Sequence, residues 1–363
     1  MTAGAEQSGL SWNRLAGRPA KVSQSAATML NLISRLRVGV PDRFLAAIAV
    51  ALAFMIYVTW DQLHWWKSKP DYAFGWLVPL FVVYLMVERW PRFRQIFAAS
   101  TPVPRVSLIR GAIAAGMGLV LGGGLAVFLL GAFYRVGAGV SQPGSIAVAF
   151  GFCGILLGIV YFNVPNGWVG KGAPATGWRA LREDARLRTV SLLFFPALIW
   201  MLSAPLVTAV ENAISLFLLQ HVVSVVFAVF NFLGFPMLQE GNVLILPRGH
   251  VGVVDACSGI RSLTGCLFAG SFLGAVFLDR LWKKILLLAV AMALAFLTNL
   301  LRSLFLTGWA YAYGSDAIEG SLHDYTGFAV LALTTAGLFG LLPLFSSQNW
   351  RRWLRFEPVA VPA

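Results

Sequence analysis

Eight long apolar blocks constrain this chain more than any other feature. Each is near the ~17–25 residues that a helix needs to cross a bilayer. Only 12% of the residues are charged, whereas a soluble domain carries about 25%. We therefore predict an all-α polytopic membrane protein with about eight transmembrane helices. They are expected at residues 44–60, 73–88, 108–130, 145–162, 189–205, 261–278, 284–302 and 325–345.

The basic residues predict the orientation of these helices. Most of the 28 lysines and arginines lie in the first 43 residues, in alternate connecting segments and after the last block. Because loops rich in lysine and arginine stay in the cytoplasm, we place both termini there. The net charge of +13 is thus explained by the basic residues that orient the helices in the membrane, and we expect no nucleic-acid partner. The predicted divisions are a basic cytoplasmic segment (1–43), a multispan membrane domain (44–345) and a cytoplasmic tail (346–363).

The stretch 206–235 needs a separate interpretation, because part of it is apolar enough to cross. A crossing here would invert the three helices that follow and turn their basic flanks outward. We therefore predict a re-entrant or interfacial helix on the outer side. Two short strands, Val243–Leu246 and Val251–Val254, should follow it as a small outer β-hairpin.

Three polar motifs come out on one membrane face if the predicted helices alternate in direction. Cys257, Arg302 and His323 each lie at the outer end of an apolar segment. A thiol, a guanidinium and an imidazole at one face are the groups that a cysteine nucleophile uses. The pattern indicates a membrane enzyme rather than a passive span.

Cys257 is the cysteine with polar neighbours. Asp255 follows a β-like run and precedes a helical block, so it is expected to be the N-cap. Cys257 then lies in the first turn, where the helix dipole favours a thiolate. Arg261 is four residues on, on the same helical face. Most free cysteines are small buried hydrophobic residues, and we predict this for Cys153 and Cys266.

Arg302 and His323 are the expected partners of this thiol. Arg302 can stabilise a thiolate or the oxyanion of a tetrahedral intermediate, and Asn299, one turn earlier, can orient it. His323 can take the thiol proton and later protonate a leaving amine. Each residue also has a structural interpretation without a catalytic role: a snorkelling arginine, an asparagine that packs between helices and an ordinary interfacial histidine. Three further histidines are also expected outside: His64, His221 and His250.

At these residues the chain resembles the exosortase/archaeosortase family of multispan cysteine transpeptidases. The resemblance covers roughly residues 40–345 and rests on three motifs in order: Ala256-Cys257-Ser258-Gly259-Ile260-Arg261-Ser262, Asn299-x-x-Arg302 and His323-x-x-x-Gly327. Phe74-Gly75-Trp76-Leu77-Val78-Pro79-Leu80 is similar to the family's second-span motif. Two departures are Asp255, where the family usually has Glu, and Ala73-Phe74, where it often has Ser-His.

The resemblance implies a function. Cys257 would be the nucleophile, His323 the general acid/base and Arg302 the residue that steadies the thiolate or oxyanion. The implied partners are exported proteins with a carboxy-terminal tail, made of a short motif (Pro-Glu-Pro in the best-known branch), a hydrophobic helix and basic residues. The implied location is the inner membrane of a bacterial cell, with the active site on the periplasmic face beside membrane lipid and a link to exopolysaccharide production.

Two other functions fit the same residues. A thiol-dependent acyltransferase at the outer leaflet would use the cysteine on a lipid acyl donor. A non-catalytic membrane subunit of a polysaccharide export assembly would not need it. The sequence shows no metal or nucleotide signature, so we predict no cofactor, and it does not identify the acceptor or the tail motif.

Overall fold

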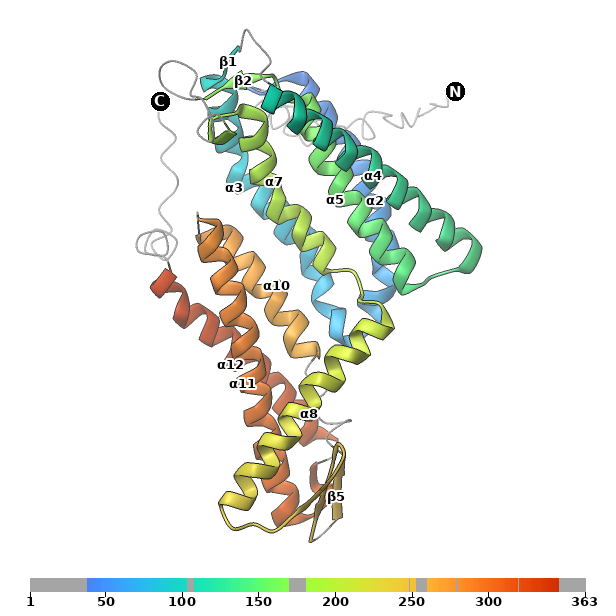
Figure 1. The fold of residues 1–363 in the computed structure, drawn as a ribbon, viewed down its shortest axis with the longest axis vertical. Helices are drawn as coiled ribbons and strands as arrows, with labels where there is room; N and C mark the ends of the chain where they lie inside the picture. The colour runs from blue at the N-terminus through green and yellow to red at the C-terminus, as the bar shows by residue number, and fades with distance from the viewer. Residues whose placement is uncertain are drawn as a thin grey trace, which may run out of the picture.

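The protein is described by a computed structural model. It describes residues 38–102, 108–169, 181–247, 249–252, 260–278, 280–318 and 320–345. Nearly all of this is helical (Figure 1), which confirms the all-α polytopic membrane fold. Asp255 and Cys257 lie outside the described residues, as does the Arg261 side chain.

The first half of the chain forms a bundle of five long helices. They are α2 (Asp42–Ser68), α3 (Val78–Ala99), α4 (Leu108–Ala138), α5 (Gln142–Asn163) and α7 (Ala185–Leu202), with the 3₁₀ helix η2 (Pro70–Leu77) before α3. Phe44, Phe152 and Trp200 are fully buried in its core. Two short antiparallel strands, β1 (Thr101–Pro102) and β2 (Gly167–Trp168), pair at one end.

A glycine seam lets α4 and α5 approach closely. A Cβ atom on Gly151 would lie 2.5 Å from the backbone nitrogen of Phe128, and one on Gly124 would lie 2.9 Å from the Gly151 carbonyl oxygen. Small residues at such a seam permit the backbone contact that holds helices together where there is no hydrophobic driving force.

The second half carries the polar motifs. It consists of α8 (Thr208–Phe232), β3 (Leu238–Glu240), β4 (Val243–Leu246), β5 (Gly249–Gly252), α10 (Ile260–Phe277), α11 (Leu281–Tyr313), η3 (Ser315–Ile318) and α12 (Ser321–Phe345). In Figure 1, α10 and α12 run upward and α11 runs downward, and the strands lie at the lower end.

The predicted hairpin is a three-stranded antiparallel sheet of order β3-β4-β5. The strand at Val243–Leu246 has the expected bounds, whereas the next begins at Gly249, two residues early, and Leu238–Glu240 was not predicted. Gly241 makes the first turn with a φ of 60°, where a residue without Cβ is favoured. Leu244, Leu246 and Val251 are buried against α8 and α11, which explains why so short a sheet is stable.

The helix α8 lies across the lower end of the molecule. It continues from the lower end of α7 and does not return through the bundle (Figure 1). Its first turn is fixed by Glu211, which accepts hydrogen bonds from Lys69 Nζ (2.8 Å) and Gln142 Nε2 (3.1 Å). Its second half buries Val222, Val226 and other apolar side chains against the end of α11.

Length and composition alone do not decide which helices cross. Among the described residues, eight helices are long and apolar enough, and these include α8, while the apolar Ser262–Phe277 of α10 is shorter. The direction of the chain in Figure 1 favours α10 as the span and α8 as the outer helix. The position of α8 at the membrane surface stays a prediction.

Candidate active site

Arg302 and His323 lie side by side, although they come from different helices. Arg302 Nη2 is 3.0 Å from His323 Nε2 and also donates to the His323 carbonyl oxygen at 3.0 Å. Both side chains are half-buried. The structure thus joins the second and third polar motifs, which are separated in the chain by the rest of α11 and by η3.

The contact fixes the form of the imidazole. A guanidinium has only donors, so His323 Nε2 must accept from Arg302. The ring is then neutral and carries its proton on Nδ1. A neutral imidazole is the form that can take a proton from a thiol.

Thr326 holds this pair in place and was not assigned a role from the sequence. Its hydroxyl accepts from Arg302 Nε at 3.2 Å and donates to the His323 carbonyl oxygen at 2.9 Å. The signal for it was its spacing, because residues three apart share a helical face. Gly327 faces the guanidinium, but a Cβ there would lie 3.7 Å from Arg302 Nη2, an ordinary van der Waals distance, so this contact does not require a glycine.

Arg302 lies within α11 and not at its end, because the helix continues to Tyr313. Residues after 302 are still apolar, and Leu306 and Ala310 pack on α8. From Leu281 to Arg302 the helix rises about 32 Å at 1.5 Å per residue. That is close to the ~30 Å of a hydrocarbon core, so Arg302 is one bilayer thickness from the start of the helix.

Asn299 does not reach Arg302. Its side chain is 4% exposed, and its Oδ1 accepts no hydrogen bond within the described part of the chain. It lines a cavity of about 320 Å³ between α8, α10 and α11, together with His221 of α8 and Leu263 of α10.

The other cysteines occupy apolar surroundings. Cys266 is buried, as predicted, and Cys153 is half-buried with its Sγ donating to the Ala197 carbonyl oxygen at 3.0 Å. Among the residues that the structure describes, no three His, Cys, Asp or Glu side chains gather where they could hold a metal ion.

The second-span motif packs beside the start of α10. Thr264 donates to the Asp71 carbonyl oxygen at 3.0 Å, and the Phe74 and Phe268 rings are 4.8 Å apart. Gly75 lets the motif pack on α2, because a Cβ there would lie 2.1 Å from Trp66 Nε1. The motif therefore supports the helix whose first turn follows the cysteine.

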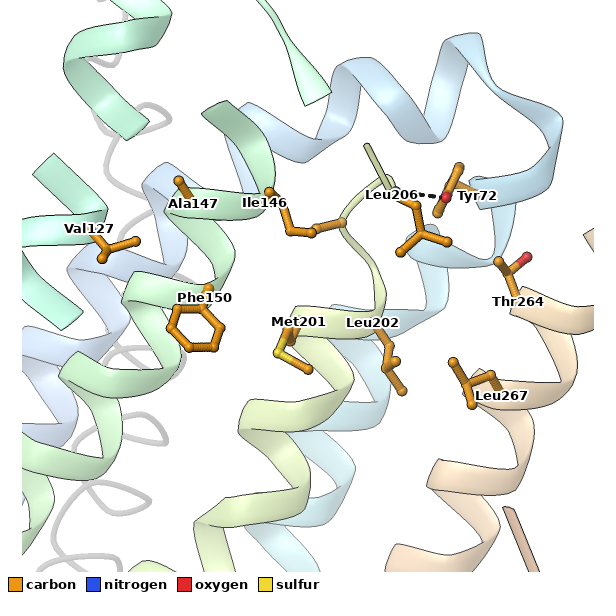
Figure 2. Close-up of a pocket in the computed structure, with 11 residues that line it drawn as sticks. Tyr72, Val127, Ile146, Ala147, Phe150, Met201, Leu202, Leu206, Thr264 and Leu267 are labelled. Atoms are coloured by element: carbon orange, nitrogen blue, oxygen red, sulfur yellow. Dashed lines mark hydrogen bonds between the residues drawn. The ribbon is translucent and has the colours of Figure 1, made fainter. Parts of the chain in front are cut away.

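An apolar cavity of about 390 Å³ lies on this side of α10. Figure 2 shows Thr264 and Leu267 of α10 across from Met201 and Leu202 at the end of α7, with Phe150 of α5 beyond them. Tyr72 closes one end, where its hydroxyl accepts from the Leu206 backbone N–H at 2.8 Å. The first half of α10 thus has a cavity on each side.

A known protein family matches most of the chain. The family described as Transmembrane exosortase (Exosortase_EpsH) matches residues 65–340. The chain belongs to the transmembrane exosortase family. The match begins near the end of α2 and runs into α12, so it includes Cys257, Arg302, His323 and the second-span motif. No curated protein and no solved structure matches the chain. As an exosortase with several apolar helices, it is an integral membrane protein.

Proposed function

We propose that this exosortase is a cysteine protease/transpeptidase that cleaves the carboxy-terminal sorting tail of exported proteins. The reaction takes place at the outer face of a bacterial inner membrane, with both termini in the cytoplasm. The observation that carries the proposal is the contact between Arg302 Nη2 and His323 Nε2 at 3.0 Å. It pairs a guanidinium with a neutral imidazole beside the helix that begins just after Cys257.

The proposed chemistry begins with proton transfer. The Cys257 thiol gives its proton to His323, and the thiolate attacks the carbonyl carbon of the scissile peptide bond. Arg302 turns from His323 Nε2 to the oxyanion, which releases Nε2 for the proton. When the tetrahedral intermediate collapses, the C–N bond breaks and the imidazolium protonates the leaving amine of the tail.

A thioester on Cys257 then separates cleavage from transfer. Water or an acceptor amine attacks it, His323 takes the proton of the attacking group, and the Cys257 sulfur leaves. With water the product carries a new carboxylate, and with an amine it carries a new amide. The free thiol is restored in both cases.

The depth of the site supports a membrane-anchored substrate. Arg302 lies about one bilayer thickness from the start of α11. A protein held by one hydrophobic helix diffuses in the bilayer plane and presents the residues before that helix at this boundary. Such tails, and the link to exopolysaccharide production, are what the family resemblance implies for the substrate.

The test uses an exported protein with a motif, helix and basic tail, expressed with the wild type or with Cys257→Ala. Intact mass is measured in membrane and released fractions. We expect loss of the tail with the wild type only. Equal loss with folded Cys257→Ala would refute the nucleophile and favour an export subunit. A gain of acyl mass on an uncut substrate would favour the acyltransferase.

A further inference from the structure

We infer that the cavity between α8, α10 and α11 binds the first turn of the tail's hydrophobic helix, on the carboxy-terminal side of the cut. The inference rests on the proposed function. Among the residues that the structure describes, the walls of this cavity are apolar except for the side chains of Asn299 and His221.

Asn299 supplies a hydrogen-bond acceptor that the protein does not use. Asn299 is only 4% exposed, and its Oδ1 has no hydrogen-bond partner among the described residues. A buried polar atom without a protein partner costs about 1–3 kcal/mol, so beside a cavity such an atom points to a bound donor, either water or a ligand.

His221 supplies a second acceptor from the opposite wall. Its Nδ1 is 2.7 Å from the Phe217 carbonyl oxygen, which can only accept, so Nδ1 carries the proton. In the neutral ring, Nε2 is then an acceptor. The ring is exposed on α8, and within the described chain Nε2 has no hydrogen bond.

The ligand that fits two acceptors and apolar walls has N–H donors and apolar side chains. The first four N–H groups of a helix have no partner inside the helix. In a membrane each of them costs several kcal/mol if it is left unsatisfied. A lipid acyl chain offers no donor and would leave Asn299 Oδ1 as it is.

The depth of the cavity in the membrane indicates which part of the tail binds there. Along α11 it extends from Met292 to Asn299, which ends about 4.5 Å before Arg302 at 1.5 Å per residue. Residues that follow the cut in a membrane-anchored tail lie on this side of Arg302. The cavity therefore receives the start of the tail helix, while the motif lies outside.

The test uses a reporter protein fused to a Pro-Glu-Pro motif, a leucine-rich helix of about 20 residues and an arginine cluster. A photo-crosslinking amino acid is placed in Cys257→Ala protein at Leu218 or Leu263, which line the cavity, or at Leu119, which is 78% exposed on α4. We expect crosslinks from the two cavity positions to the start of the reporter helix, at least tenfold above Leu119. Equal yields, or crosslinks to lipid alone, would overturn the inference.

A proline scan tests the role of Asn299. Proline in the first helical turn keeps the helix and removes one N–H. At one position it should lower crosslinking about fivefold, the value of one hydrogen bond, and it should have no effect in Asn299→Leu or Asn299→Ala. Effects that persist in both variants would overturn the assignment.

Cleavage by the wild type separates this inference from the proposed function. Cavity crosslinks without cleavage would support the binding site and refute the protease. Cleavage without cavity crosslinks would refute the binding site and leave the protease intact.

Discussion

Arg89 joins three helices of the bundle through carbonyl groups that need a donor. Its side chain is 3% exposed, and its two Nη atoms donate to the carbonyl oxygens of Leu192 on α7 and Ala275 on α10, the latter at 2.9 Å. Leu192 needs this donor because Pro196, four residues on, has no N–H. Ala275 lies in the last turn of α10, where helical donors run out.

The cost of removing Arg89 follows from these two bonds. Arg89→Met keeps the apolar stem and removes both donors. Each buried carbonyl left without a partner costs about 1–3 kcal/mol. Part of this cost is offset, because the variant no longer has to desolvate the guanidinium charge on folding. We therefore expect a loss of about 2–4 kcal/mol in the free energy of unfolding.

Pro196→Ala tests the reason for this cost. Alanine restores the N–H that donates to Leu192 within α7, so Arg89→Met should then cost only about half as much. The coupling free energy between Arg89 and Pro196 should be about 1–2 kcal/mol. It is measured from reversible unfolding of the four proteins in mixed micelles.

Arg92→Met is the matched control, because the Arg92 side chain is 48% exposed and pairs with Glu88. It should change the free energy of unfolding by less than about 0.5 kcal/mol. An Arg89→Met cost that is equal with and without Pro196 would refute the role of the Leu192 carbonyl.

Two further predictions each compare a substitution with a matched control, the first with glycines of α5 and α4 and the second with threonines of α12. Gly151→Ala should lower the free energy of unfolding by about 1–3 kcal/mol, because its Cβ would lie 2.5 Å from a backbone nitrogen of α4. Gly122→Ala, with nothing within 4 Å of its Cβ, should leave this free energy unchanged. Equal effects of the two substitutions in thermal unfolding would refute the glycine seam. Thr326→Val removes the hydroxyl that holds Arg302 and should lower kcat for tail cleavage about tenfold. Thr335→Val should leave kcat unchanged, because the Thr335 hydroxyl donates to the Leu331 carbonyl oxygen of its own helix. An unchanged kcat for Thr326→Val would refute the positioning role.

Much of the fold follows from the apolar blocks. Their positions predict eight of the long helices within a few residues at most ends, because length and hydropathy determine what can cross a bilayer. Where helices end was harder to predict. The helix α11 continues to Tyr313, where α8 covers its last turns, and such tertiary contacts are not visible in a hydropathy pattern. The strand β3 was missed because Leu238–Glu240 is too short to show alternation.

Part of the candidate site could likewise be predicted from the sequence, and part could not. Charge and helix direction predict that Arg302 and His323 share a face, and the structure brings them into contact. Thr326 was missed because its signal, the three-residue spacing from His323, does not distinguish one hydroxyl from other residues on the same face of an apolar helix. Asn299 was expected to orient Arg302, whereas its Oδ1 has no partner in the described chain. The roles of Cys257, Asp255 and Arg261 remain predictions from the sequence.

The central claim is a thioester on Cys257, and hydroxylamine tests it most directly. Wild-type protein in membranes is mixed with the tail substrate and hydroxylamine, and the released product is analysed by intact mass. The account predicts a hydroxamate at the new carboxyl terminus, since the amine attacks a thioester faster than water does, and no product with Cys257→Ala. A product that carries only a carboxylate at every hydroxylamine concentration, or one that also forms with folded Cys257→Ala, would contradict it.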